Sequence, residues 1–325
     1  MRRKLQNILF NFNDLTKELY QKGAYNNDND NLLLKLKSSL TLDTYFNAFP
    51  LKKWKKYTKI RNLSLNIKLK GKVQLTIMES YYVNKQTYHE TVSSVYIYDS
   101  DSEKIYDIPI KIGCNADLIY IKLLPLSENA VFYGGYFYTN LDEDLFNNTK
   151  LAIGICTYKR EEFVLKNIDN LNKNLFNDDY YKENVDVFVS DNGHTLSQYN
   201  LNSQNIHIFE NENLGGSAGF CRCMLEAFFN KNLTKSYDYI LLMDDDIYFE
   251  VESLKRLLEF TNLLKKEFNN SMIAFSMFPI EQPYLQYTKG KLREKNISKC
   301  INENLDLRYL KNVLINESEA DPNFS

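Results

Sequence analysis

Three consecutive carboxylates, Asp244-Asp245-Asp246, carry the sharpest chemical signal in this sequence, and they directly follow the apolar stretch 239–243. Adjacent carboxylates repel one another, so a cluster at the end of a buried strand favours a compensating cation. Side chains alternate between the faces of an extended chain, so Asp244 and Asp246 can bind one metal ion while Asp245 points elsewhere. Hard oxygen ligands predict Mg²⁺ or Mn²⁺ with open positions for a diphosphate. The alternative is a solvated charge run, and a lysine or arginine seated on the carboxylates would argue against the metal.

The loop Thr157-Tyr158-Lys159-Arg160 follows a second apolar stretch, 151–156. Its side chains suit a nucleotide, because Tyr158 can stack on a base and Arg160 can bind a phosphate. A solvated helix start capped by Thr157 is an equally weighted alternative.

Two further loops follow apolar stretches, namely Asp191-Asn192-Gly193 and the glycine-rich segment 211–219. Asp191 could accept a hydrogen bond from a ring N–H or a ribose hydroxyl, although Asn-Gly by itself favours a plain turn. Gly215 and Gly216 let the backbone approach a ligand, and the helix start behind them could face an anion. Their spacing differs from the dinucleotide-binding fingerprint.

The elements that must position these loops alternate between strand and helix. Apolar residues recur at helical spacing over 161–175 and 250–268, a further helix is expected over about 217–230, and short apolar runs predict strands over 151–156, 185–190, 205–210 and 237–243. This alternation predicts a mostly parallel sheet covered on both faces, with ligands bound beyond the carboxyl ends of its strands. All four loops are therefore expected at one edge of that sheet.

Before residue 140 the pattern is strand-like. Leu63, Leu65, Ile67 and Leu69 alternate with polar residues, and the alternation resumes at Val73 after Gly71-Lys72, which predicts a hairpin of half-buried strands. Closely spaced short runs continue to residue 138 without a helix, so we predict a β-sandwich, with Gly134-Gly135 marking a bulge or a close backbone approach. The predicted domains are 1–148, a sandwich with a helical or irregular N-terminal lead, and 149–325.

The motifs CTYKR, SDNG, NENLGGSAGFCR and LLMDDDI, in this order, resemble family 2 glycosyltransferases of the GT-A fold. More narrowly they resemble the galactofuranosyltransferase-like branch, which has an N-terminal β-sandwich before a Rossmann-like GT-A domain with a mostly parallel sheet. The resemblance implies an inverting, metal-dependent hexosyltransferase that uses a UDP-sugar. The expected donor is UDP-galactofuranose, and the expected acceptor is a glycan or lipid-linked glycan of a capsule, lipopolysaccharide or cell wall.

Carried over by motif, the residues that would contact the UDP part of the donor are Thr157, Tyr158, Arg160, Asp191, Asn213 and Asp244. Asp244 and Asp246 would bind the Mn²⁺ or Mg²⁺ that bridges the diphosphate. Two alternatives stay open: an enzyme of the same fold that uses another nucleotide sugar, such as a rhamnosyl or hexopyranosyl donor, and a non-catalytic glycan-binding or assembly protein.

One departure from the family pattern concerns the catalytic base. In the family the base and a metal-binding histidine follow the DDD strand, whereas His89, His194 and His207 all precede Asp246 here. The base is expected beyond Ser325, so the sequence is interpreted as the sandwich and donor-binding half of an enzyme, truncated, frameshifted or split. We expect donor binding without efficient transfer. Exposed apolar surface around 272–277 and 284–287 would favour a homo-oligomer or a partner chain.

Composition restricts the remaining classes. Lys+Arg is 40 and Asp+Glu is 42, which argues against nucleic acid as a partner. The sequence shows no membrane span or signal peptide, and five scattered cysteines favour a reduced, cytoplasmic setting, with Cys221 and Cys223 assigned to helix packing. Peripheral attachment to the inner face of a bacterial plasma membrane, through lysines around Trp54, is weighed below a solvated charge run.

Overall fold

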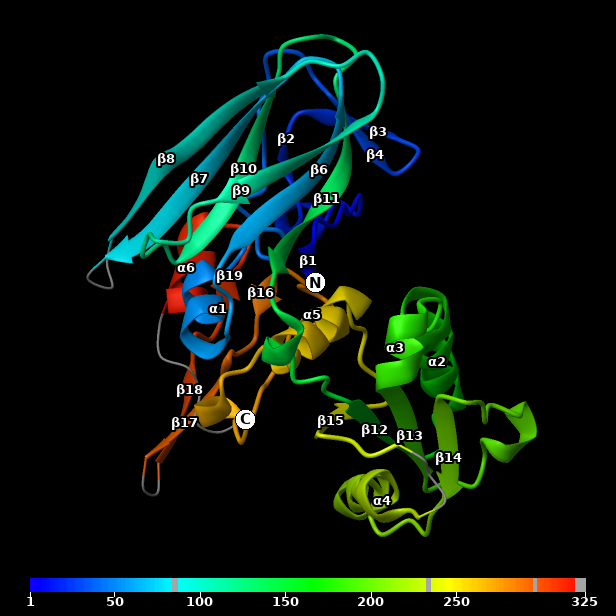
Figure 1. The fold of residues 1–325 in the computed structure, drawn as a ribbon. Coiled ribbons are helices and arrows are strands. Elements are labelled where there is room, and N and C mark those ends of the chain that lie inside the picture. The colour runs from blue at the N-terminus through cyan, green and yellow to red at the C-terminus, as the bar shows by residue number, and fades with distance from the viewer. Residues whose placement is uncertain (84–86, 232–234, 295–296, 319–325) are drawn as a thin grey trace. The chain divides into compact units, whose positions relative to one another are not determined.

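The computed structural model describes residues 1–83, 87–231, 235–294 and 297–318. The chain divides into two compact units, which are described separately (Figure 1). The first comprises Met1–Leu145 together with the segment from Leu263 onward, and the second is Phe146–Asn262. The beginning of the second unit lies close to the predicted boundary at 148/149. The segment after Leu263, which the sequence analysis assigned to the second domain, packs instead with the first unit.

The first unit contains two antiparallel sheets. One sheet is built from β1 (Arg2–Asn7), β3 (Tyr25–Asp28), β4 (Asn31–Leu34), β6 (Leu63–Lys70), β9 (Lys104–Ile110) and β11 (Val131–Asn140). Its order is β3-β4-β11-β6-β9, with β1 beside β11. The other sheet has the order β2-β5-β10-β7-β8 and consists of β2 (Lys22–Gly23), β5 (Leu40–Thr41), β7 (Val73–Val83), β8 (Thr87–Tyr98) and β10 (Leu118–Pro125). The predicted β-sandwich is thus confirmed.

The predicted hairpin between the Leu63 and Val73 strands is wrong. β6 pairs with β9 and β11, whereas β7 pairs with β8 and β10, so Gly71-Lys72 carries the chain from one sheet to the other. The predicted faces are nevertheless right, because Leu65, Ile67 and Leu75 are fully buried. Alternation determines which face of a strand is buried, but two strands that share a core need not be hydrogen-bonded to each other.

Local features of the sandwich follow from its sequence. A bulge at Gly134-Gly135 shifts the register of β11 against β6, as predicted, and Gly134 has a φ of +98°. A Cβ atom at Gly135 would lie 2.1 Å from the Asn66 carbonyl oxygen, so only glycine fits there. The N-terminal residues, expected to be helical or irregular, begin instead with a strand, because β1 pairs with β11. The short helix η1 (Lys17–Leu19) follows.

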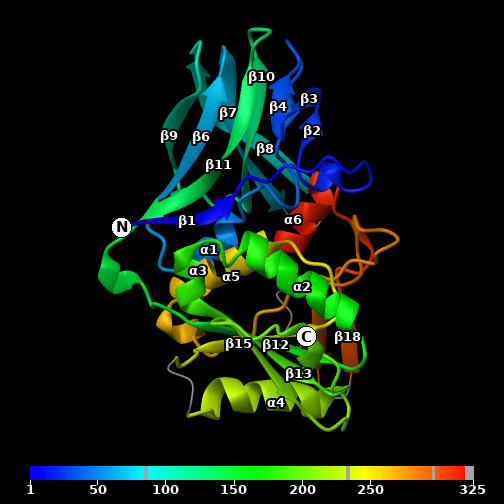
Figure 2. The ribbon, with the colours of Figure 1, turned by 90° about the vertical axis from the view of Figure 1, so that its right-hand side faces the viewer.

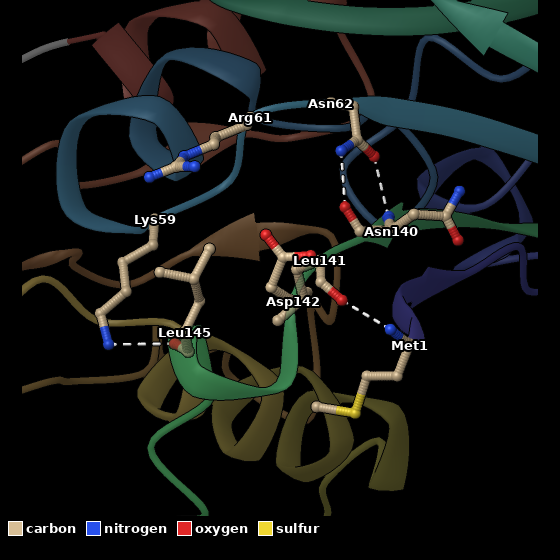
Figure 3. A pocket seen from close by; sticks show the side chains of 8 residues that line it. All are labelled: Met1, Lys59, Arg61, Asn62, Asn140, Leu141, Asp142 and Leu145. Carbon is tan, nitrogen blue, oxygen red and sulfur yellow. Dashed lines mark hydrogen bonds between the residues drawn. The ribbon is translucent and has the colours of Figure 1, made fainter.

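The ends of β11 and β6 are tied together beside a pocket of about 400 Å³ (Figure 3). Asn62 donates to the Asn140 carbonyl at 2.5 Å and accepts from the Asn140 N–H at 2.8 Å. Lys59 donates to the Leu145 carbonyl at 3.0 Å, near η2 (Glu143–Leu145), and burial lowers the pKa of Lys59. These contacts hold residues 140–145, at the end of β11 and after it, against the segment that precedes β6.

The lysine-rich segment forms α1 (Leu51–Tyr57). Trp54 is buried and stacks on Phe49 with ring centroids 5.7 Å apart. Lys52 pairs with Asp117 at 2.7 Å and Lys53 with Glu317 at 2.7 Å. Trp54 therefore belongs to the core and is not available for insertion into a membrane, and Tyr57 at the end of α1 is half-buried against Phe268. No helix in the described part of the chain is long and apolar enough to cross a bilayer.

The described part of the segment from Leu263 onward is mostly irregular, and its last element is a helix. It contains η4 (Lys266–Phe268), the ribbons β16 (Leu285–Gln286) with β19 (Leu305–Asp306) and β17 (Gly290–Glu294) with β18 (Ile297–Ile301), and α6 (Leu310–Ser318). Leu310, Val313 and Leu314 pack with Met78 and Tyr120 in one buried cluster. Met272, Met277 and Tyr287 are exposed as expected, whereas Tyr284 packs against that cluster.

The second unit is a three-layer α/β structure. Its sheet has the order β14-β13-β12-β15 and is entirely parallel, consisting of β12 (Leu151–Thr157), β13 (Val185–Asp191), β14 (Ile206–Glu210) and β15 (Tyr239–Asp244). α2 (Glu161–Asn174), α3 (Asp179–Asn184) and α5 (Val251–Asn262) cover one face, and α4 (Gly216–Phe229) covers the other (Figure 2). The parallel sheet and the helices predicted over 161–175 and about 217–230 are confirmed, whereas the helix predicted over 250–268 ends at Asn262. The turn η3 (Ser197–Tyr199) precedes β14.

Close packing of α4 on the sheet depends on small residues. A Cβ atom at Gly219 would lie 2.1 Å from the Cys156 sulfur, and one at Gly154 would lie 3.0 Å from the Cys223 Cβ. Cys223 is fully buried and donates to the Ile155 and Phe188 carbonyls, whereas Cys221 is exposed. Cys223 is therefore a packing residue, as the sequence predicts.

We expect iodoacetamide to modify Cys221 readily in the native protein and Cys223 only after unfolding. Burial raises the pKa of Cys223 from 9.0 to about 12, which lowers its thiolate fraction about a thousandfold at neutral pH. Trypsin cleaves after Arg222, so mass spectrometry measures the two rates on separate peptides. Equal native rates would contradict the observed packing of α4.

Candidate active site

The carboxyl edge of the parallel sheet collects the four predicted loops. The register places Thr157 opposite Asp191, Asp191 opposite Glu210, and Cys156 opposite Asp244. Successive strands β12, β13 and β14 step one way across the sheet, and β15 then lies on the other side of β12. This reversal makes the gap between the β12 and β15 ends the topological switch point, where open α/β sheets bind ligands. Both the Thr157–Arg160 loop and the Asp triplet flank that point.

Asp245 is the buried centre of the edge. Its Oδ2 accepts a hydrogen bond from the Thr157 hydroxyl at 2.7 Å, and its carbonyl accepts one from Asn167 of α2 at 2.8 Å. Thr157 is therefore not the cap of α2, whose N-cap residue is Arg160. Asp244 is exposed and Asp246 half-exposed, so the triplet alternates between outward and inward side chains. Asp245 thus joins β12, α2 and the end of β15.

Arg160 lies on the carboxylates of the triplet. Its Nη1 is 2.5 Å from Asp246 Oδ2 and 3.3 Å from Asp245 Oδ1. Hydrogen bonds from these carboxylates, first Asp246 and then Asp245, raise the pKa of the guanidinium. An arginine on these carboxylates is the contact that was expected to overturn the metal site. The side chains of Arg160 and Asp246 are 51% and 43% exposed, however, and ion pairs this accessible are weak and easily exchanged.

The residues available to a divalent cation are few. Among the described residues, no group of three or more His, Cys, Asp or Glu is arranged to hold a metal ion. The donor set fits such an ion only as two hard carboxylates, Asp244 and Asp246, completed by phosphate oxygens and water, which is common for Mg²⁺. The guanidinium on Asp246 shows that this edge accommodates a positive charge. A metal there would have to displace Arg160.

Asp191 is turned toward its own loop. Its carboxylate is fully buried and accepts hydrogen bonds from the N–H groups of Gly193, Thr195 and Leu196 at 2.7–3.0 Å. A carboxylate has about four acceptor positions, so three of them are occupied by backbone. Asp191 shapes the loop after β13, and its contact with a nucleotide stays a prediction.

Asn192 connects three loops, a role that the sequence analysis missed. Its N–H donates to the Thr157 carbonyl at 2.9 Å, and its Oδ1 accepts from Asn211 Nδ2 at 2.9 Å. Its Nδ2 lies 3.4 Å from the Gly215 carbonyl oxygen. The loops after β12, β13 and β14 are thereby fixed to one another. The Asn-Gly dipeptide signals a turn in the sequence, but nothing in it indicates these partners.

Further exposed residues of the edge are Tyr158, Asn213 and the two glycines at the start of α4, Gly215 and Gly216. Tyr158 is 48% exposed, and Lys159 Nζ lies 5.3 Å from the centroid of its ring. Asn213 accepts from the Gly215 N–H at 3.3 Å, and Gly215 has a φ of +86° as the N-cap residue of α4. A Cβ atom at Gly216 would meet nothing within 4 Å, so no internal contact requires glycine there. Free space next to a helix start suits an anion.

The second unit has the fold of a GT-A domain, an α/β unit whose parallel sheet carries polar loops at its switch point. The chain belongs to glycosyl transferase family 2, whose family model matches residues 152–315. A second family model, described as galactofuranosyltransferase 2 N-terminal, matches residues 15–111.

Two curated relatives carry the name galactofuranosyltransferase GlfT2. The protein from Mycobacterium tuberculosis is 22% identical over 269 residues, which cover 80% of this chain and 40% of the relative. The protein from Mycolicibacterium smegmatis is 22% identical over 269 residues, covering 79% and 39%. The chain thus spans about two fifths of the length of these relatives. Among solved structures, a mutant of a family 29 carbohydrate-binding module aligns at 14% identity with a TM-score of 0.27, covering 43% of this chain and 91% of that one, too low to support an inference.

Proposed function

We propose that this chain binds UDP-galactofuranose at the carboxyl edge between β12 and β15 and takes part in its transfer to a glycan acceptor. The observation that carries the proposal is the parallel register, which brings the Thr157–Arg160 loop and the Asp triplet to one switch point. The similarity to two galactofuranosyltransferases supports the choice of sugar. The reaction is a single displacement: an acceptor hydroxyl forms the new glycosidic bond, the bond to UDP breaks on the opposite face, and a base takes the hydroxyl proton.

Different residues of the edge bind different parts of the donor. Tyr158 stacks on the uracil ring, and Arg160 leaves Asp246 to bind a phosphate, which a guanidinium does in a bidentate manner. Asn213 and the N–H groups at the start of α4 face the negatively charged part of the donor. Asp244 and Asp246 would hold Mn²⁺ or Mg²⁺, and such an ion would supply positive charge to neutralise the diphosphate leaving group. Asp245 and Asn192 keep the loops in register.

Calorimetric titration of the protein with UDP, with and without Mn²⁺, tests the proposal. We expect binding that depends on Mn²⁺ and a preference for UDP over ADP and GDP. A panel of UDP-galactofuranose, UDP-galactopyranose and a rhamnosyl donor then distinguishes the proposed sugar from the alternatives. Absence of UDP binding with the metal present would contradict the proposal.

Arg160→Ala should have opposite effects on the two ligands. The change frees Asp246, so Mn²⁺ alone should bind up to about fivefold tighter, because an exposed ion pair no longer competes. UDP with Mn²⁺ present should bind about tenfold more weakly, since a charge-assisted phosphate contact is lost. Calorimetry and Mn²⁺ electron paramagnetic resonance measure both affinities.

Lys173→Ala is the matched control, because Lys173 forms an exposed ion pair with Asp169 at 2.7 Å on α2. It should leave both affinities unchanged. Unchanged Mn²⁺ affinity in Arg160→Ala would show that Arg160 and the metal do not share Asp246.

A further inference from the structure

A second pocket, of about 630 Å³, is formed by the first unit alone. Strand residues of the five-stranded sheet contribute Lys22, Tyr88 and Glu90, and the chain entering α6 contributes Arg308 and Tyr309. The volume lies within the roughly 300–1,000 Å³ range of small-ligand pockets. The proposed transfer reaction uses none of these residues.

The wall made by the start of α6 is rigid. Arg308 donates to both carboxylate oxygens of Asp306, at 2.6–3.2 Å, and its guanidinium lies 3.6 Å from the centroid of the Tyr284 ring. Leu307 and Leu310 on either side are buried in the core. Tyr309 between them is 62% exposed at the pocket. An aromatic side chain held outward by a fixed backbone loses little entropy when it binds a ligand.

The charges that line the pocket are balanced. Three acidic residues, Glu18, Asp43 and Glu90, face three basic ones, Lys22, Arg308 and Lys311. Several are already paired: Lys22 lies 3.1 Å from Asp43, and Glu90 accepts a hydrogen bond from the Tyr120 hydroxyl and lies 3.8 Å from Lys122 Nζ. The pocket therefore attracts neither anions nor cations strongly, yet it offers many hydrogen-bond donors and acceptors.

We infer that this pocket binds a neutral saccharide chain, separately from the donor site. Sugar rings present C–H faces that pack on aromatic rings and hydroxyls that exchange hydrogen bonds with carboxylates and amines. Tyr309 and Tyr88 supply the aromatic faces, and Glu90, Asp43 and Lys22 supply the polar partners. The choice of a galactofuranose chain as probe rests on the proposed function, but the chemistry of the pocket does not.

Titration of the full chain with a galactofuranose tetrasaccharide, followed by protein-observed NMR, tests the inference. Tyr309→Ala should weaken binding at least about fivefold, since an aromatic contact is lost. Glu90→Gln should weaken it through altered hydrogen bonding. Tyr287→Ala is the matched control, because Tyr287 is 54% exposed in the same unit and outside the pocket lining.

The outcomes separate this inference from the proposed function. UDP binding should be unaffected in Tyr309→Ala, and tetrasaccharide binding should persist in Asp244→Asn. Wild-type affinity in both pocket variants, no binding by the wild type, or loss of saccharide binding in Asp244→Asn would each overturn the inference. So would a clear preference for an oligogalacturonate, because a charge-balanced pocket gives no reason to favour a polyanion.

Discussion

Asp244→Asn is expected to abolish the Mn²⁺-dependent part of UDP binding. The variant replaces one of only two carboxylates that the strand end offers outward, and the amide carries no charge to hold a divalent cation. Changes to the outer shell of metal sites typically cost 10–100-fold in affinity, so loss of a direct ligand should cost at least about 100-fold. Calorimetry with UDP at fixed Mn²⁺ measures the effect.

Asp169→Asn is the control for this substitution. Asp169 is an exposed carboxylate of the same unit, paired with Lys173, so its neutralisation changes the net charge equally. It should leave UDP affinity unchanged. If Asp244→Asn bound UDP and Mn²⁺ like the wild type, Asp244 would have no part in donor binding, and the assignment of the metal to the triplet would fall.

Periodicity in the sequence predicts the helices and strands better than it predicts which strands pair with each other. The 3.6-residue spacing of Val164, Ile168 and Leu171 predicted α2, and all three are buried against the sheet. The two-residue spacing around Leu65 and Leu75 predicted buried faces correctly, but not that these strands lie in different sheets. Pairing depends on contacts between distant segments, such as β11 with β6, which no local pattern encodes.

For the candidate site too, the sequence predicts the location but not the side-chain contacts. Its location follows from a general rule about strand ends, so the sequence could place Thr157, Asp191 and Asp244 at one edge. Side-chain partners depend on the path of loops that meet only in three dimensions. The bonds that Asn192 makes to Thr157 and Asn211 and the seating of Arg160 on Asp246 are therefore visible only in the structure.

The position of Arg160 also matters for the choice between a metal-dependent enzyme and a non-catalytic protein of the same fold. The same residue was assigned to the donor phosphate from the sequence and is found on the triplet in the structure. Both positions are compatible if Arg160 exchanges one anionic partner for another when the donor arrives with its metal. In that case the ion pair keeps the carboxylates compensated until the donor replaces it.

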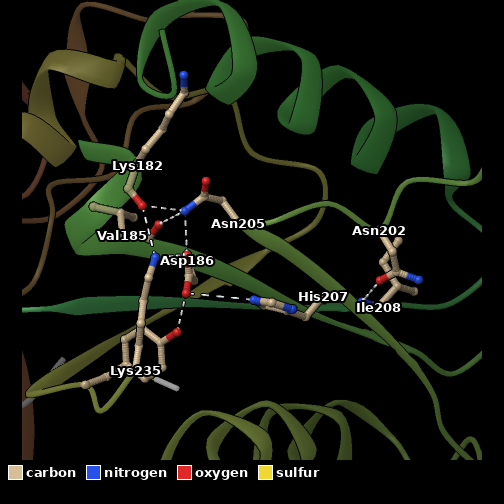
Figure 4. A network of polar contacts seen from close by, with 9 residues as sticks. Lys182, Val185, Asp186, Asn202, Asn205, His207, Ile208 and Lys235 are labelled. Carbon is tan, nitrogen blue, oxygen red and sulfur yellow. Dashed lines mark hydrogen bonds and ion pairs between the residues drawn. The ribbon is translucent and has the colours of Figure 1, made fainter. Parts of the chain in front are cut away.

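The buried carboxylate of Asp186 is the second place where a single substitution should have a large effect (Figure 4). Asp186 Oδ1 accepts from Asn205 Nδ2 at 2.6 Å and from Lys235 Nζ at 2.9 Å, while Oδ2 accepts from the Tyr237 hydroxyl. His207 Nε2 is 3.8 Å from Oδ2, too far for a hydrogen bond but close enough to interact electrostatically. This network ties the beginning of β13 to two neighbouring loops.

Asp186→Asn should destabilise the second unit by about 3 kcal/mol at pH 7. The amide oxygen can still accept from Lys235 and Asn205, but the NH2 group that replaces Oδ2 cannot accept from the Tyr237 hydroxyl. The Lys235 ammonium, whose side chain is 17% exposed, also loses its counter-ion. Removing one partner of a largely buried ion pair costs roughly 3–5 kcal/mol. Urea unfolding followed by circular dichroism measures the difference, and Asp169→Asn, with its exposed carboxylate, should change stability by less than about 0.5 kcal/mol.

The effect should depend on pH in one direction. Burial alone would raise the pKa of Asp186, but the interactions with His207, Tyr237 and Lys235 outweigh burial and hold it below the ordinary value of 3.8. A lowered pKa in the folded protein stabilises it above pH 3.8, and this contribution is lost as the pH falls through the folded pKa. The stability gap between wild type and Asp186→Asn should therefore be full at pH 7 and shrink below about pH 4. A gap that stayed constant down to pH 3 would show that the cost of the substitution is packing rather than loss of the charged carboxylate.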